Sequence, residues 1–271
     1  MRLFDTHAHI DLPRFGSPEE QRLAAIRARQ AGIAAILVPG IEPATWPELQ
    51  GAVRALAESV EGVRFHTALG VHPQALGDLP PEDDDSLAER LAAALDADPG
   101  VVAIGECGLD FGPRGRGAAP PRQLAVLRVH LDLARRRGLP LLLHCLEAHG
   151  ALVERLLEAP TPPSILHSYS GSAEVAERLC RAGHFISFAA SLTLPRARRP
   201  ARAAAAVPLD RLLCETDSPD QTPYPRRPAR NEPAFLVDVV AALAAVRGES
   251  AEAIAEATTA NACRVLGVAP P

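Results

Sequence analysis

The side chains best suited to binding a cation stand at the ends of short apolar segments of this chain. They are Asp5, His7 and His9 at the end of the first segment, then His72, Glu106 with Asp110, His144, His167, and Glu215 with Asp217. Imidazole and carboxylate groups in such places are hard to explain as packing, because a buried polar group without a partner is costly. We therefore predict that these side chains gather in one site.

Six of these residues form a plausible ligand set for metal ions. His7 and His9 are two residues apart, so on an extended chain both rings point the same way and can hold one cation. Together with Glu106, His144, His167 and Asp217 they are too many for one tetrahedral ion, but they suit two. Two ions about 3.5–4 Å apart can share a carboxylate and stabilise both the attacking and the leaving oxygen of a phosphoryl transfer. Nitrogen and oxygen ligands suit Zn, Mn or Mg, so we expect two divalent cations of these types.

Eight apolar segments are the expected strands that position these groups. They are rich in Val, Ile and Leu, as strands covered on both faces should be. The segments are Leu3–Ala8, Ala34–Pro39, Arg64–Val71, Val101–Gly105, Leu139–Cys145, Ser164–Ser168, His184–Ala189 and Arg211–Thr216.

Helix-like segments alternate with these strands. They are Ser17–Ala31, Pro43–Val60, Glu82–Ala97, Pro121–Gly138, Ala148–Ala159, Ser172–Ala182, the less regular Leu194–Val207, Pro233–Val246 and Ala251–Leu266. Repeated strand–helix alternation predicts parallel βαβ units, and hence an α/β fold of the (β/α)8 TIM-barrel type as one domain over residues 1–271. An open doubly wound sheet is the alternative, although no GxGxxG motif supports a dinucleotide site. In a barrel the strand ends converge on one mouth, where active sites are built.

Composition narrows the class of protein. The chain has 271 residues, is 47% apolar and carries a net charge of −5, so there is no global electrostatic case for nucleic-acid binding. Every basic side chain is Arg, and the lack of Lys excludes a two-metal site built on a carbamylated lysine. The five cysteines form no CxxC pair and fit small core residues of a reduced, cytoplasmic protein. No apolar run is long enough to cross a membrane.

The ordered motifs resemble those of the TatD family of metal-dependent deoxyribonucleases. They are Asp5-Thr6-His7-Ala8-His9, Gly70-Val71-His72-Pro73, Gly105-Glu106-Cys107-Gly108-Leu109-Asp110, Leu143-His144, His167-Ser168-Tyr169-Ser170-Gly171 and Glu215-Thr216-Asp217-Ser218-Pro219, with Arg230-Asn231-Glu232-Pro233 and Thr259-Ala260-Asn261 further on. HxH alone is a weak signal, but six motifs in order across almost the whole chain are specific.

This resemblance implies particular roles. The metal ligands would be His7, His9, Glu106, His144, His167 and Asp217. Glu106 would lie between the two ions, and Asp217 would also accept a proton from the attacking water. His72 would lie near the substrate phosphate; a structural turn before Pro73 is the alternative. The implied reaction is hydrolysis of a DNA phosphodiester, at single strands or ends.

Other residues leave more than one interpretation open. Tyr169 could stack on a base or simply pack, and Arg230, with Arg226 and Arg227, could contact substrate at the mouth. A second arginine cluster, Arg196, Arg198, Arg199 and Arg202, could bind DNA or form a solvated face. Family members usually carry Arg two residues after the strand-five histidine, where this chain has Leu146, and the loop Phe111–Pro121 also departs from the family pattern.

Two other functions remain open at this stage. A metallohydrolase of the same fold could act on a small phosphoester, a lactone or an amide, because one barrel hosts many chemistries. A non-catalytic metal-binding protein is the third hypothesis, although structural metal sites are more often closed and rich in thiolates. The native metal, the exonuclease or endonuclease mode and the oligomeric state are not determined by these residues.

Overall fold

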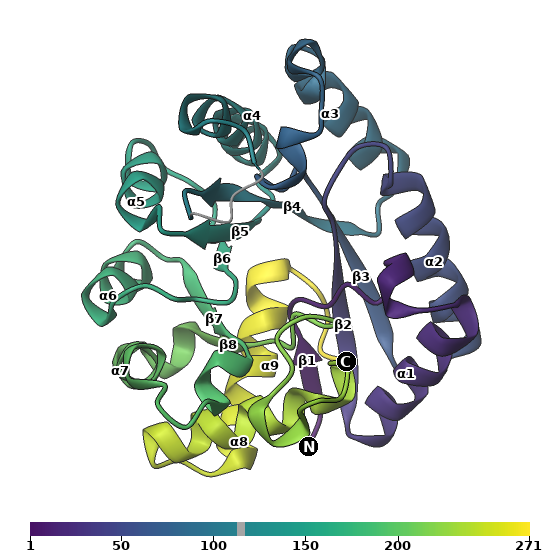
Figure 1. The fold of residues 1–271 in the computed structure, drawn as a ribbon, viewed down its shortest axis with the longest axis vertical. Coiled ribbons are helices and arrows are strands. Elements are labelled where there is room, and N and C mark those ends of the chain that lie inside the picture. Colours follow the sequence, from purple (N-terminus) through teal and green to yellow (C-terminus); the bar gives the residue numbers. More distant parts are fainter. Residues whose placement is uncertain (113–116) are drawn as a thin grey trace.

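Eight parallel strands form the centre of the molecule, each hydrogen-bonded to the next in chain order. The computed structural model describes residues 1–112 and 117–271. Figure 1 shows the strands in a ring surrounded by helices. Their bounds are β1 Leu3–Asp5, β2 Ile33–Gly40, β3 Arg64–Leu69, β4 Val101–Asp110, β5 Leu141–Leu146, β6 Ile165–Leu166, β7 Phe185–Phe188 and β8 Leu212–Cys214. The predicted (β/α)8 barrel is confirmed.

The helices follow the strands along the chain. They are α1 Pro18–Gln30, α2 Trp46–Ser59, α3 Leu87–Ala97, α4 Pro120–Arg137, α5 His149–Leu157, α6 Ala173–Arg181, α7 Arg198–Ala206, α8 Leu236–Arg247 and α9 Ala251–Leu266. Local sequence explains where they begin. Ser17 caps α1 by accepting a hydrogen bond from the backbone N–H of Glu20, whose side chain accepts one from Ser17 N–H, and Pro18 occupies the first turn.

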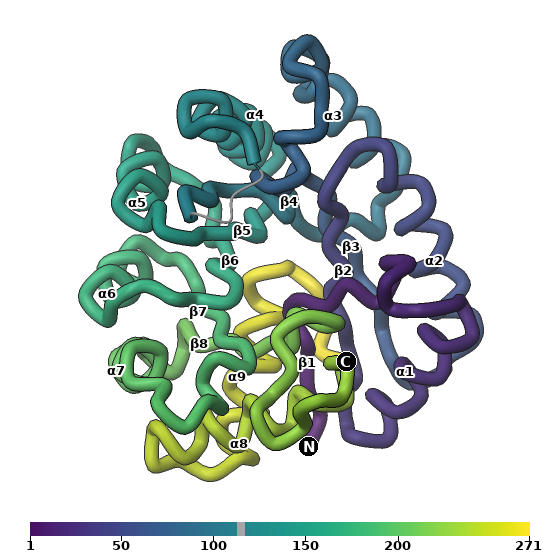
Figure 2. The backbone as a smooth tube through the Cα atoms, viewed as in Figure 1, coloured from purple at the N-terminus to yellow at the C-terminus, as the bar shows by residue number. Residues whose placement is uncertain are grey.

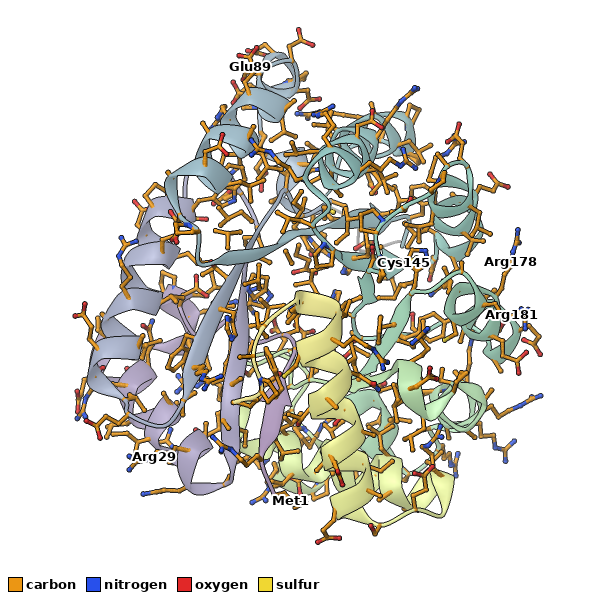
Figure 3. All side chains as sticks on the ribbon, turned by 180° about the vertical axis from the view of Figure 1, so that it is seen from behind. Met1, Arg29, Glu89, Cys145, Arg178 and Arg181 are labelled. Atoms are coloured by element: carbon orange, nitrogen blue, oxygen red, sulfur yellow. The ribbon has the colours of Figure 1, made fainter. Side chains whose placement is uncertain are left out.

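The barrel interior is closed at one end by α9. Alternate strand residues point inward and form a separate apolar cluster with the last turns of α9: Phe4, Ala35, Leu37, Ala68, Ala103, Leu142, Ile165, Phe185, Leu213, Ala262, Cys263, Val265 and Leu266. Figure 3, drawn from behind, shows α9 lying across this end of the barrel. The remaining core lies between the strands and the outer helices. The carboxyl ends of the strands are therefore left to form the open mouth.

The ring is completed beyond the ends of β1 and β8. Ala8 forms an isolated parallel bridge with Ser218, and the Asp217 N–H donates to the His7 carbonyl at 2.9 Å. The residues that follow β1 and β8 are thus held together by backbone hydrogen bonds. This arrangement fixes the backbone on both sides of His7 and Asp217.

Several strand ends differ from the expectation, and two of these differences concern site residues. We expected the first strand to reach Ala8, but β1 ends at Asp5, and beyond it the chain forms scattered backbone hydrogen bonds and a single bridge, at Ala8. We also placed Glu106 after the fourth strand, whereas β4 continues to Asp110. The register with β5 shifts between Ile104 and Cys107, which lets the strand continue past Glu106.

Two findings concern the rest of the chain. Among the described residues, no helix is long and apolar enough to span a bilayer. All five cysteines are buried and unpaired, as expected for small core residues. Arg114 and Arg116 of the loop Phe111–Pro121 lie outside the described residues.

Candidate metal centre

The six predicted ligands meet at the barrel mouth around Glu106. His7 and His9 follow β1, His144 lies within β5, and His167 comes directly after β6. Asp217 follows β8 with a backbone φ of 54°, a left-handed conformation that turns the chain sharply after the strand. Five separate strands therefore deliver these side chains to one place.

The two carboxylate oxygens of Glu106 face two different groups of imidazoles. Oε2 lies 3.3 Å from His7 Nε2 and 3.5 Å from His9 Nε2. Oε1 lies 2.8 Å from His167 Nε2 and 3.3 Å from His144 Nδ1. Glu106 is almost fully buried, so neither oxygen has water as a ready alternative partner. This is the arrangement of a carboxylate that joins two cation sites.

The first group has the spacing of a tetrahedral metal site. With metal–ligand distances of about 2.1 Å, neighbouring ligand atoms of a tetrahedron lie about 3.4 Å apart. His7 Nε2 is 3.0 Å from His9 Nε2 and 3.5 Å from Asp217 Oδ1, and His9 Nε2 is 3.9 Å from the same oxygen. With Glu106 Oε2, these atoms could hold one divalent cation.

The second group has three such atoms. His144 Nδ1 and His167 Nε2 lie 3.1 Å apart, and both approach Glu106 Oε1. Three protein ligands leave a coordination position open, which is the pattern of a catalytic rather than a structural site. The residues present therefore fit a pair of divalent cations, with Glu106 contributing to both sites.

Carboxylates behind the histidines orient two of the rings. His144 Nε2 lies 3.5 Å from Asp110 Oδ2, and His167 Nδ1 lies 3.4 Å from Glu215 Oε1. In each case the ring's other nitrogen faces Glu106, and such partners are known to fix the orientation of metal-binding histidines. Asp5 acts on the backbone instead: it accepts hydrogen bonds from His7 N–H and from both the N–H and hydroxyl of Thr216.

His72 also approaches Glu106, but its hydrogen bonds argue against metal ligation. Its Nε2 lies 3.1 Å from Glu106 Oε1, while its Nδ1 accepts a hydrogen bond from the Gln74 N–H at 3.1 Å. Burial lowers the pKa of His72, which favours the neutral ring despite Glu106. A neutral ring that accepts at Nδ1 carries its proton on Nε2. Nε2 is then a hydrogen-bond donor and has no lone pair for a cation.

The electrostatics of the site favour positive charge at its centre. Burial alone would raise the pKa of Glu106, but the nearby His72, His167 and His7 rings hold it well below its usual range. Conversely, burial opposes charge on His167, yet Glu106 and Glu215 raise its pKa well above its ordinary value. Glu106 is therefore an ionised carboxylate, and cations can replace the protons that balance its charge.

A pocket of about 450 Å³ opens above this cluster. Besides the metal-site residues, its lining includes Leu12, Ile41 and Leu146 on the apolar side and Ser168, Ser170 and Ser191 on the polar side. Leu146 is thus in the pocket wall, where the resemblance led us to look for an arginine.

Several polar residues of this pocket were not predicted from the sequence, and Arg14 and Gln221 are two of them. Arg14, in the turn after His9, lines the mouth and forms an ion pair with Asp220 at 2.5 Å. Gln221 donates hydrogen bonds to Asp217 Oδ2 and to the Ser168 hydroxyl. No motif marked them, although both stand in loops that follow expected strands.

Two predicted substrate contacts are not in this pocket. Tyr169 is only 2% exposed; its hydroxyl donates to the Ser172 carbonyl and its ring packs against Phe188 and His149. Of the two interpretations left open for Tyr169, these contacts favour packing over stacking on a base. Arg230 is exposed, but its guanidinium lies over the Phe15 ring and does not line the pocket. Its contact with substrate at the barrel mouth stays a prediction.

Known proteins match this chain along nearly its whole length. The model of the family described as TatD related DNase matches residues 4–267. The metal-dependent hydrolase YjjV of Escherichia coli is 38% identical over 98% of both chains, and its crystal structure superposes with a TM-score of 0.86 over 99% of both. A Pectobacterium carotovorum protein named 3′-5′ ssDNA/RNA exonuclease TatD is 32% identical, covering 98% of this chain and all of that one.

Proposed function

The chain belongs to the family of TatD-related DNases, a family of metal-dependent hydrolases, and we propose that it hydrolyses phosphodiester bonds of single-stranded DNA or RNA at strand ends. The observation that carries this proposal is Glu106, whose two oxygens face separate groups of nitrogen ligands at the floor of an open pocket. The names of several relatives support the substrate class. We further propose that the centre holds two divalent cations, either Zn, Mg or Mn.

In this proposal each residue of the site has a defined task. His7, His9 and Asp217 with one oxygen of Glu106 would hold the first cation, and His144 and His167 with the other oxygen would hold the second. Bound cations would polarise the phosphoryl oxygens and acidify the attacking water. Asp217 would accept the proton of the attacking water, and Gln221 donates a hydrogen bond to the second carboxylate oxygen of Asp217.

His72 and the pocket walls would orient the substrate. The protonated Nε2 of His72 can donate to a phosphoryl oxygen, since the tautomer is fixed by the Gln74 N–H. Leu12, Ile41 and Leu146 offer an apolar wall for a sugar or base. The pocket volume falls within the usual range for small-ligand sites and suits one terminal nucleotide.

Metal-dependent release of nucleotides tests the proposal. Purified protein is incubated with single-stranded DNA, double-stranded DNA and single-stranded RNA, with Mg, Mn or Zn and with or without chelator. We expect nucleotide release from single strands that chelator abolishes and that disappears in His144→Ala and Asp217→Ala. Intact nucleic acid together with hydrolysis of a small phosphoester, lactone or amide would contradict it and favour the alternative metallohydrolase. Bound metal with no activity on any substrate would indicate a non-catalytic protein.

A further inference from the structure

Three neighbouring arginines on α7 have no ion-pair partner among the described residues. Arg198, Arg199 and Arg202 are all exposed, and no described carboxylate lies within 4.0 Å of their guanidinium groups. Two nearby arginines do have partners: Arg181 pairs with Glu177 and Arg211 with Asp210. The three arginines therefore form a cluster of positive charge in which no guanidinium is held in an ion pair by a described residue.

Their position in the helix is unfavourable for stability. Arg198 and Arg199 stand in the first turn of α7, where the helix dipole disfavours positive charge, and no acidic residue occupies that turn. Arg202 is four residues after Arg198 and three after Arg199, so like charges face one another on one side of the helix. Helix stability does not explain this arrangement, whereas binding of an anion does.

The same arginines line a groove between α6 and α7. The groove has a volume of about 390 Å³, and the remaining lining residues are Ser172, Ala173 and Glu174. Figure 2 shows the two helices side by side on the outside of the barrel. Glu174 offsets one of the three positive charges, which leaves the groove positive.

Two loops link the catalytic pocket to the groove in the chain. The loop after β6 gives Ser168 and Ser170 to the pocket and Ser172 to the groove. The loop after β7 gives Ser191 to the pocket and leads into α7 with its arginines. A chain bound in the pocket can therefore leave it along these serines and reach the arginines.

We propose that this groove between α6 and α7 binds the backbone phosphates of the nucleic-acid strand next to the terminal nucleotide held in the catalytic pocket. The inference rests on the proposed function, because it assigns the second anchoring point of the same substrate. Guanidinium forks match phosphate oxygens, and contacts to the backbone need no base sequence. A strand that spans both sites has one end at the metal centre and its next phosphates on α7. Short substrates that end inside the pocket do not reach this groove.

The test compares two triple variants that remove equal charge. Arg198→Gln/Arg199→Gln/Arg202→Gln removes the cluster. The control, Arg136→Gln/Arg178→Gln/Arg181→Gln, changes exposed arginines in the last turns of α4 and α6. Figure 3 shows Arg178 and Arg181 pointing outward from the rim. Each protein is assayed with a single-stranded dodecamer and with a small activated phosphodiester, and its affinity for the dodecamer is measured by fluorescence anisotropy at several salt concentrations.

We expect the cluster variant to show at least a tenfold higher KM and weaker binding for the dodecamer, with kcat and small-substrate hydrolysis unchanged. The slope of log affinity against log salt should become shallower by about 1–2, because about 0.7 of slope is lost for each phosphate contact on a single strand. Equal KM, affinity and salt slope in the cluster variant, the control and the unmodified protein would overturn this inference while leaving the nuclease assignment intact. Failure of the unmodified protein to bind or cleave any nucleic acid would instead overturn both.

Discussion

Glu106 is the residue on which the whole centre depends, because it is the only one of the six proposed ligands with an oxygen facing each group of histidines. Glu106→Gln keeps the shape but replaces one anionic oxygen with an NH₂ group that cannot bind a cation. We expect tightly bound metal to fall from two ions per chain to at most one, and hydrolysis to fall by at least about 10³-fold. Elemental analysis after gel filtration, with circular dichroism to confirm folding, checks this. Retention of two ions would contradict the shared-carboxylate arrangement.

The position of His72 can be interpreted in two ways, as a metal ligand or as a hydrogen-bond donor to the substrate. By distance alone, His72, Glu106 and His144 could share a cation. The hydrogen bond from the Gln74 N–H, however, places the imidazole proton on Nε2, so we assign a donor role to this ring.

The variant His72→Ala should therefore keep the full metal content. Its kcat/KM for nucleic acid should fall by about 10²-fold, the usual effect of losing one donor to a charged transition state. Metal content by elemental analysis and steady-state kinetics on the same preparation provide the measurement. Loss of one ion per chain would show that the ring is a ligand after all.

At the scale of elements, the end of β3 is held in place by a histidine on α4. His130 is fully buried; its Nε2 accepts the Val71 N–H at 3.1 Å and its Nδ1 donates to the Val126 carbonyl at 2.8 Å. Val71 precedes His72, so this contact also positions the proposed phosphate donor. His130→Leu leaves a buried N–H without an acceptor, and we expect the free energy of unfolding to drop by about 1–3 kcal/mol.

Chemical denaturation of the metal-free protein measures that loss. His130→Gln keeps an amide oxygen that can accept from the backbone, so it should recover part of the stability and of the activity on nucleic acid. Equal stability of the leucine variant and the unmodified protein would show that the Val71 N–H finds another partner.

Much of the element order was predictable from sequence, and the reasons are physical. Apolar segments separated by helical patterns predict alternation, and convergence of the strand ends predicts that His7, His144 and Asp217 meet. The details that a single segment could not decide depend on contacts with other segments. Glu106 lies inside β4 because of a register shift against β5, and Tyr169 is buried because Phe188 and His149 pack against it. Arg14 reaches the pocket through a turn that carries no motif.

At the scale of the whole molecule, α9 closes one end of the barrel and completes the packing of its interior. Leu266, in its last turn, is 5% exposed and packs within the interior cluster. Leu266→Ala should lower the free energy of unfolding by about 2–5 kcal/mol through lost burial and a cavity. Leu157→Ala is the matched control, because Leu157 at the end of α5 is 39% exposed and should change stability by only about 0.5 kcal/mol. Thermal and chemical denaturation of both variants measure these changes in stability. Equal losses of stability in the two variants would contradict this account.

Acid stability of the whole fold should depend on His184. This ring is buried at the start of β7, and its Nδ1 has no hydrogen-bond partner among the described residues. Burial lowers the pKa of His184 from 6.5 to about 4, so the folded state keeps the ring neutral while the unfolded chain takes up a proton below about pH 6.5. The stability contribution of this group is therefore present at neutral pH and is lost as the pH falls from about 6.5 toward 4.

In the variant His184→Leu, the side chain at this position takes up no proton in either the folded or the unfolded state. Relative to the variant, the unmodified protein should lose about 2 kcal/mol of stability between pH 7 and pH 5, as the two pKa values require. Urea denaturation in the presence of chelator measures the difference and keeps metal release out of the comparison. Other titrating groups are common to both proteins, so their contributions cancel. A pH-independent difference between the two would mean that His184 has the same pKa in the folded and the unfolded state.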